Sequence, residues 1–158
     1  MKNRITFVLM LMIGIDPGTV TGVAIWDVDE KTLVDVNSFS ILQAIYYVGL
    51  MAKHAEVCLY VEDPNTWIPF GNRRGTAARL QGAGSIKRDF AIWMEFATER
   101  NIKVIRTRLQ GTLKKLPAAQ FKLITGWQDG TNEHGRDAAM LVFGRHAEPG
   151  ETHRRVKR

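Results

Sequence analysis

The stretch IGIDPGTVTGVAIWD, residues 13–27, decides the fold because a carboxylate, Asp16, ends an apolar segment just before a Pro-Gly turn. The eight residues at positions 7–14, FVLMLMIG, predict a strand that is buried on both faces. A charge at the edge of a hydrophobic core costs free energy unless it has a partner. We therefore expect Asp16 to be placed beside a group that compensates its charge.

Patterns along the rest of the chain predict a mixed sheet covered by helices. Strands are expected at 7–14, 19–28, 32–36, 57–61 and 102–105. Helices are expected at 40–54 and 76–100, from Pro117 to the loop at 126–131, and from about 133 to 147. Three hairpin-connected strands followed by strands alternating with helices indicate an α/β fold with a mixed five-stranded sheet.

Length and charge suggest one domain with an anionic partner. The 158 residues, 45% of them apolar, suffice for a single core, which we assign to residues 1–147. Residues 148–158 form a basic tail that we expect to be disordered. The net charge is +6, and residues 100–128 hold seven Lys or Arg and no Asp or Glu. Such a basic segment favours nucleic acid as the partner.

The single cysteine and the N-terminus indicate a cytosolic protein. Cys58 lies within the apolar run 57–61, so a disulfide framework is excluded and a buried, inert thiol is favoured over a nucleophile. The apolar run after Lys2 and Arg4 lacks a small-residue cleavage site and is too short to span a bilayer. We therefore expect no membrane association.

Three carboxylates occupy positions from which they can meet. Asp16 ends the first strand, Glu62 ends the fourth, and Asp137 lies near the start of the last helix, three residues after His134. If the two strands are neighbours, their terminal acids lie side by side, and two like charges about 4 Å apart repel by about 1 to 4 kcal/mol. Divalent cations such as Mg²⁺ or Mn²⁺ remove this penalty, and His134 can complete a metal shell or carry a proton.

Each of these residues also has an ordinary structural explanation. Asp16 before Pro-Gly is a turn signal by itself, and Glu62 with Asp63 can simply end a strand before a proline. Asp137 near a helix start stabilises the helix dipole, and a lone histidine is usually structural. Only the conjunction of the four residues indicates a functional site.

Four motifs in the right order resemble the RuvC-like branch of the ribonuclease H-like superfamily, the Holliday junction resolvases and their phage relatives. They are IGIDPGTVTGVAI, LYVEDP, RLQGAGSIKRDF and NEHGRDAAML, and the resemblance extends over about residues 7 to 145. It implies that Asp16, Glu62, His134 and Asp137 are the catalytic residues and hold two Mg²⁺ or Mn²⁺ ions. Asp63, directly after Glu62, leaves the second acid less certain than the first.

The resemblance also implies a cytoplasmic homodimer, in a bacterial or phage-infected cell, that binds a four-way DNA junction and needs no organic cofactor. Its two active sites make paired nicks, leaving 5′-phosphate ends, in DNA recombination and repair. DNA contacts are implied in the loop after the fourth strand and in the following helix, namely at Trp67, Phe70, Arg73, Arg74, Lys87 and Arg88. Lys114 and Lys115 in the basic segment are further candidates for phosphate contacts.

Several of these DNA-binding assignments leave alternatives open. Trp67 or Phe70 can stack on a base at a branch point or simply pack within the loop. Lys87 falls on the same helical stripe as Leu80, Ala83, Phe90, Met94 and Ala97. Its stem can therefore snorkel along apolar surface, or its ammonium can reach the scissile phosphate.

Other classes of protein share some of these features. The motif DPGTVTG also resembles the phosphate-binding hairpin of actin-like and sugar-kinase ATPases, which clamp nucleotide between two domains where this chain supplies one. The run GAGSIK lacks the ending of a phosphate-binding loop and falls within a helical pattern. A nuclease for RNA or RNA–DNA hybrids, a short RuvC-like enzyme of ribosomal RNA processing, and a branched-DNA-binding protein without catalysis remain alternatives.

Overall fold

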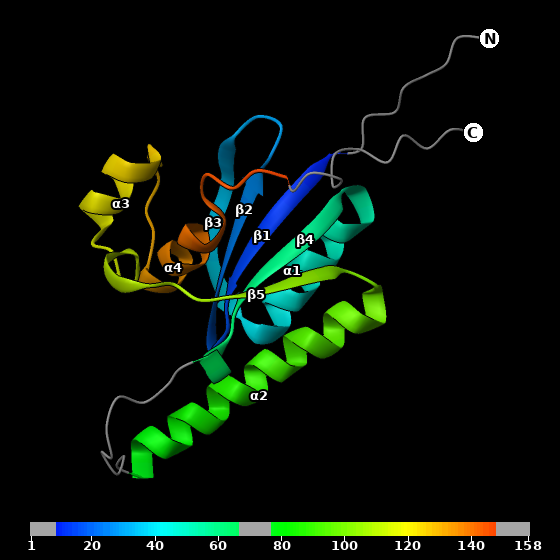
Figure 1. Cartoon of the computed structure of the whole chain (residues 1–158), viewed down its shortest axis with the longest axis vertical. Helices are drawn as coiled ribbons and strands as arrows, with labels where there is room; N and C mark the ends of the chain where they lie inside the picture. The colour runs from blue at the N-terminus through cyan, green and yellow to red at the C-terminus, as the bar shows by residue number, and fades with distance from the viewer. Residues whose placement is uncertain (1–8, 67–76, 148–158) are drawn as a thin grey trace, which may run out of the picture.

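The structure, a computed structural model, describes residues 9–66 and 77–147 (Figure 1). Its centre is a five-stranded sheet in the order β3-β2-β1-β4-β5. The strands are β1 (Met10–Asp16), β2 (Val20–Asp27), β3 (Thr32–Ser40), β4 (Glu56–Glu62) and β5 (Lys103–Thr107). The pairs β1–β2 and β2–β3 are antiparallel, whereas β1–β4 and β4–β5 are parallel. The mixed α/β sheet predicted from the sequence is thus confirmed.

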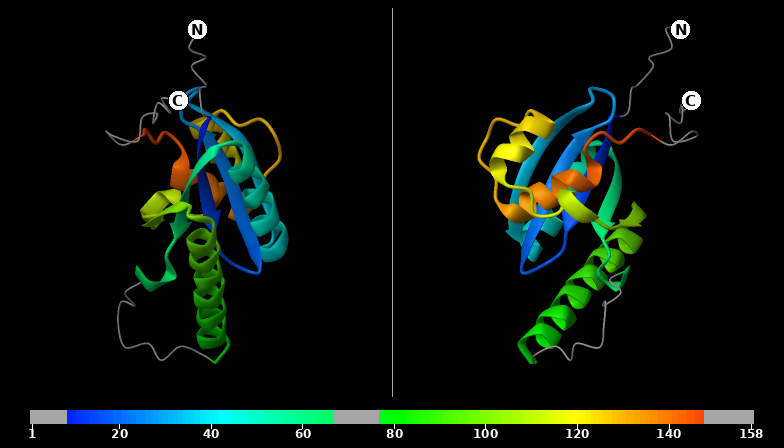
Figure 2. Two further views of the ribbon diagram at one scale, coloured as in Figure 1. Left: turned by 90° about the vertical axis from the view of Figure 1, so that its right-hand side faces the viewer. Right: turned by 60° about the vertical axis from the view of Figure 1, so that its left-hand side comes forward.

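Four α-helices cover the two faces of the sheet. They are α1 (Ile41–His54), α2 (Ala77–Arg100), α3 (Ala118–Thr125) and α4 (Glu133–Val142), and two short 3-10 turns, η1 (Pro64–Thr66) and η2 (Gly111–Leu113), lie in the connections. Helices α1 and α2 pack on one face, and α3 and α4 lie on the other (Figure 2). Among the helices in the described ranges, none is long and apolar enough to cross a membrane.

The alternation of side chains along β1 and β4 divides the core into two layers. Leu11, Ile13 and Ile15 of β1 point toward α1 and α2. They belong to the same core layer as Trp93 of α2, which is fully buried. Met12 and its neighbours on the opposite face pack against α4 and against Phe121 of α3. Side chains alternate along a strand with a period of two. The residues that pack in the core therefore determine toward which face of the sheet the last side chain of each strand points.

Several predicted boundaries were wrong. Strand β1 continues to Asp16 rather than ending at Gly14, because its pairing with β2 extends to the rung Asp16–Gly22. Strand β3 is longer than predicted and ends at Ser40, which caps α1 with its side chain. Helix α4 ends at Val142 rather than 147, since the chain turns at Gly144, whose φ is +73°. The predicted tail, 148–158, and residues 7–8 lie outside the described residues.

Candidate active site

Two acids end adjacent parallel strands on the same face of the sheet. The register of β1 and β4 pairs Ile15 with Val61, so Asp16 and Glu62 occupy the next rung. Ile15 and Val61 both face α1 and α2, and the alternation therefore turns Asp16 and Glu62 toward α4. Both carboxyl side chains are largely shielded from solvent, with exposed fractions of 14% and 11%. This is the juxtaposition that the sequence predicted.

Helix α4 approaches this edge unusually closely because two glycines on the sheet leave room for it. A Cβ placed on Gly22 would lie 1.9 Å from the carbonyl oxygen of His134, and one on Gly14 would lie 2.0 Å from that of Ala138. Only residues without a side chain permit this contact between strand and helix backbone. The N-terminal turn of α4 is therefore held directly against β2, beside the end of β1.

The start of α4 is fixed by its cap. The Asn132 side chain accepts a hydrogen bond from the Gly135 amide at 2.9 Å, and its amide group donates to the Ser38 hydroxyl on β3. The cap thus satisfies an otherwise unpaired backbone donor and joins the helix to the sheet edge. His134 and Asp137 then follow at positions that face the two strand-terminal acids.

His134 is paired with Asp16. Its Nδ1 lies 2.9 Å from Asp16 Oδ2, and with the carboxylate ionised this nitrogen is the donor. The imidazole is partly exposed, at 44%, so its Nε2 edge remains accessible for a ligand or a proton. A carboxylate that orients a histidine in this way also fixes its tautomer.

The basic loop between β5 and α3 covers the other two acids. Lys114 Nζ lies 2.8 Å from Glu62 Oε1, and the Lys115 amide donates to Asp137 Oδ1 at 2.7 Å. Arg136 holds this loop in place, because its Nε donates to the Leu116 carbonyl at 2.7 Å and its Nη1 to the Thr131 carbonyl at 3.0 Å. Three carboxylates thus have three different protein partners.

The acid whose pKa is shifted most clearly is Asp16. Burial, together with the charges of Glu62 and Asp137, raises the pKa of Asp16 to about 7 despite the opposing effect of His134. Burial also raises the pKa of Asp137, with a further contribution from Glu62 and an opposing one from the Lys115 amide. Burial is the larger cause of both shifts, and the smaller effects of the neighbouring carboxylates show that the acids are close enough to influence one another.

The donor set suits a hard divalent cation. Three carboxylates and an imidazole are ligands that Mg²⁺ or Mn²⁺ accept, and the raised pKa of Asp16 is the kind of penalty that a cation relieves. Within residues 9–66 and 77–147, however, no three His, Cys, Asp or Glu side chains stand in an arrangement ready to hold a metal ion. Because Lys114 and the Lys115 amide already engage Glu62 and Asp137, side-chain rearrangement would have to accompany metal binding.

Asp63 has a different role from Glu62. It is buried at the start of η1, where its Oδ1 accepts hydrogen bonds from the backbone amide and side-chain amide of Asn65 at 2.8 and 3.0 Å. These contacts organise the turn that follows β4. Glu62 is the acid that faces α4, which supports its choice over Asp63.

The predicted DNA-binding residues divide into three groups. Trp67, Phe70, Arg73 and Arg74 lie outside the described residues. Lys87 and Arg88 are exposed on α2, where Arg88 is 3.0 Å from Asp89. Lys114 and Lys115 lie against the carboxylate cluster, and Lys115 Nζ is also 3.3 Å from Glu133.

Sequence reasoning missed the residues that support this site. Gly14 in a buried strand was the available signal for a close backbone approach, and Asn132 before Glu133 was a helix-cap signal. Arg136 carried no such signal, because its partners are carbonyl groups from Leu116 and Thr131 that only the fold brings near it.

The comparisons with known proteins identify the fold. No protein-family model and no curated protein sequence matches this chain. Among solved structures, a RuvC from T. thermophilus, solved in complex with a Holliday junction substrate, aligns with a TM-score of 0.59 at 18% sequence identity. The alignment covers 85% of this chain and 91% of that one. This chain therefore has the RuvC-like, ribonuclease H-like fold.

Proposed function

We propose that this chain is a metal-dependent endonuclease that resolves four-way DNA junctions, or closely related branched DNA, by paired nicks. The observation that carries the proposal is the convergence of Asp16, Glu62 and Asp137 with His134, at a sheet edge bordered by a basic loop. The fold shared with a protein that was solved on a Holliday junction substrate supports the choice of substrate.

Each site residue has a role that follows from its position. Asp16, Glu62 and Asp137 would hold one or two Mg²⁺ or Mn²⁺ ions, with His134 as a further ligand or proton carrier. Bound there, the metal supplies charge neutralisation at the phosphate and acidifies water. His134 keeps Asp16 oriented through Nδ1, and its accessible Nε2 edge can take up or release a proton. The products expected are 5′-phosphate and 3′-hydroxyl ends.

Positive charge next to the cluster suits a phosphodiester substrate. The Lys114 ammonium lies beside Glu62 and is 40% exposed, so it can contact a phosphate that enters the site from solvent. Lys87 and Arg88 on α2 supply further exposed cations. The aromatic and basic residues at 67–74 are proposed to contact DNA on sequence grounds alone.

A homodimer is part of the proposal because two coordinated nicks require two active sites. The N-terminal half of α2 extends beyond the sheet (Figure 1), and its described residues from Gln81 to Gly84 are exposed. Gly82 and Gly84 have no atom within 4 Å of a Cβ position, so another helix could approach closely there. We propose this half of α2 as the contact between two copies, acting in the cytoplasm.

The decisive experiment compares Asp16→Asn with the unmodified chain. A labelled four-way DNA junction is incubated with each protein in Mg²⁺, Mn²⁺ or EDTA, beside a linear duplex, a flap and an RNA–DNA hybrid. We expect metal-dependent, symmetrical nicks near the junction centre, and a loss of cleavage by at least about a thousandfold in the variant. Junction binding by the variant should persist or tighten, because one negative charge has been removed.

Other results would point to the alternatives. Preferential cleavage of the RNA–DNA hybrid would replace junction resolution by a ribonuclease activity. Tight junction binding with no cleavage in any metal would indicate a branched-DNA-binding protein. Cleavage that survives Asp16→Asn would contradict the assignment of the cluster as the active site. Glu30→Gln, an exposed acid in the turn between β2 and β3, serves as the matched control.

A further inference from the structure

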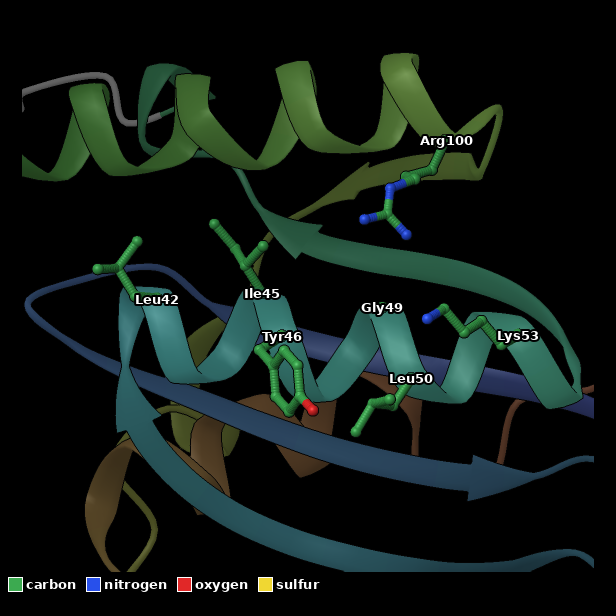
Figure 3. A pocket seen from close by; sticks show the side chains of 7 residues that line it. All are labelled: Leu42, Ile45, Tyr46, Gly49, Leu50, Lys53 and Arg100. Atoms are coloured by element: carbon green, nitrogen blue, oxygen red, sulfur yellow. The ribbon is translucent and has the colours of Figure 1, made fainter.

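A groove lies on the face of the molecule opposite α4, between α1 and the C-terminal end of α2. It has a volume of about 260 Å³ and is formed largely by α1, with Arg100 reaching across from α2 (Figure 3). Gly49 lines it, and the Arg100 guanidinium lies 3.7 Å from the position that a Cβ on Gly49 would take. The Arg100 guanidinium also stacks at 5.5 Å on Phe96 of its own helix, which holds the charge beside the groove.

The side chains around this groove are more apolar than the surface of a helix requires. Leu42 and Tyr46 are 77% and 70% exposed, and Leu50 continues their row along α1. The opposite side of α1 already buries Ala44 and Val48 in the core, so the helix is apolar on two sides. An amphipathic helix packed on a sheet needs only one apolar stripe, and clustered exposed apolar side chains indicate a binding surface.

The groove is positively charged at one end. Among the described residues that line it, Lys53 and Arg100 carry positive charge, and none is Asp or Glu. A volume below the roughly 300 to 1,000 Å³ of small-molecule pockets suits one or two anchoring side chains of a peptide. We propose that this groove docks a short acidic segment of a partner protein, whose apolar side chains contact Leu42 and Tyr46 while its carboxylates pair with Lys53 and Arg100.

Charge argues against this chain's own segments as the occupant. Residues 1–8 carry two cations and no acid, and residues 67–76 carry two arginines and no acid. Residues 148–158 carry four Lys or Arg and two Glu. Each of these segments would bring positive charge to Lys53 and Arg100, whereas an acidic partner is complementary.

Composition argues against DNA in the same place. A groove that binds a phosphate backbone presents mainly cations to it, whereas here three aliphatic side chains and a tyrosine outnumber the two cations. The groove also lies across the sheet from the carboxylate cluster, because α1 and α4 cover opposite faces (Figure 2). A partner could therefore dock without covering the proposed active site, and the proposal stands whether or not that site cuts DNA.

The test begins with a display library of random 12-residue peptides panned against the full chain. Peptides that are also retained by the Leu42→Glu/Tyr46→Glu double variant are removed by counter-selection. We expect the remaining sequences to combine Asp or Glu with Leu, Ile, Phe or Trp. Enrichment of basic sequences, or no enrichment that depends on the groove, would overturn the proposal.

Charge reversal then tests the orientation of the best selected peptide by fluorescence anisotropy. Lys53→Glu should weaken its binding at least tenfold, and a peptide whose acids are replaced by Lys should recover binding to that variant. Leu123→Glu on α3 is the matched control, since Leu123 is 86% exposed on the opposite face. Equal affinity for the Lys53→Glu variant and the unmodified chain would overturn the assigned pairing.

The same variants distinguish the other possible occupants. We expect the Leu42→Glu substitution to change neither the oligomeric state, measured by sedimentation, nor the affinity for a DNA junction. A dimer that becomes a monomer would identify the groove as a contact between two copies of this chain. Weaker junction binding would identify it as a nucleic-acid surface, and either result would contradict the proposal.

Discussion

Helices α4 and α2 pack on opposite faces of the same sheet in opposite ways. Helix α4 touches β1 and β2 backbone to backbone through Gly14 and Gly22. Among the side chains of α2 that the structure describes, Phe90, Trp93 and Ala97 in the C-terminal half are buried, while those from Gln81 to Gly84 are exposed. Figure 1 shows α2 extending past the end of the sheet, whereas α4 lies within it.

The difference matches what each helix carries. His134 and Asp137 must stay within reach of two strand-terminal acids, and a contact without intervening side chains fixes their helix most firmly. The exposed part of α2 carries Lys87 and Arg88, and their proposed contacts with DNA would require access to solvent rather than a fixed position. The fold thus places the proposed chemistry on a closely packed helix and part of the proposed DNA contacts on an exposed one.

The largest effect is expected from Gly22→Ala, which places a Cβ where it collides with the His134 carbonyl. Helix α4 must move away from β2, so the free energy of unfolding should fall by about 3 kcal/mol, as for severe overpacking. The displacement would also separate His134 from Asp16 and abolish junction cleavage. Chemical denaturation and the cleavage assay measure the two effects.

The Gly22→Ala substitution also has a stabilising effect, because alanine is favoured over glycine in a strand by roughly 0.5 to 1 kcal/mol. A Gly22→Ala protein of unchanged stability would therefore show that α4 is not held as closely as the contact indicates. Gly144→Ala is an unsuitable control, because its φ of +73° introduces strain of a different kind.

The next effect concerns pH. The pKa of Asp16 is about 7 in the folded chain and near 3.8 when the chain is unfolded, so the folded state binds the proton more tightly. Without divalent metal, stability should therefore fall as the pH rises from about 4 to about 7. Melting temperatures in EDTA across this range test the prediction, and Asp16→Asn should flatten the dependence. A steeper dependence in the variant would contradict the assigned cause.

A smaller effect is expected from Lys114→Gln. The ammonium beside Glu62 competes with any cation for that carboxylate, and its partial exposure limits the pair to about 0.7 kcal/mol. Removing the charge should tighten Mn²⁺ binding about threefold in isothermal titration calorimetry. Lys53→Gln, on the opposite face, should leave the Mn²⁺ affinity unchanged. Weaker metal binding by Lys114→Gln would show that the lysine supports the cation site instead.

The sequence predicted the strand-terminal acids because hydrophobic runs are local signals. The apolar residues before Asp16 and Glu62 identify two buried strands, and parallel neighbours bring their ends together. His134 and Asp137 were identified by their helical spacing, aided by the family resemblance. The acids were thus predictable from short segments considered one at a time.

The groups that surround those acids were not predictable in this way. Lys114 and Lys115 appeared only as part of a basic segment, because nothing local indicates that the loop after β5 turns back toward Glu62 and Asp137. On α2, Phe90 and Ala97 are buried, whereas Ala83 on the same predicted stripe is exposed. Spacing predicts which residues share a face, but not where the sheet beneath that face ends.

The smallest effect is expected from Gly82→Ala, the counterpart of Gly22→Ala on the loosely held helix. Within one copy a Cβ there meets no atom within 4 Å, so in the diluted protein the substitution should raise the free energy of unfolding by about 0.5 to 1 kcal/mol through helix propensity. Chemical denaturation of the diluted and the concentrated protein provides the measurement. An equal gain at both concentrations would contradict the proposed contact between two copies, whereas a gain that is lost in the concentrated protein would mean that a second copy packs against this glycine. In that case both helices would be closely packed, α4 against the sheet of its own chain and α2 against a second copy.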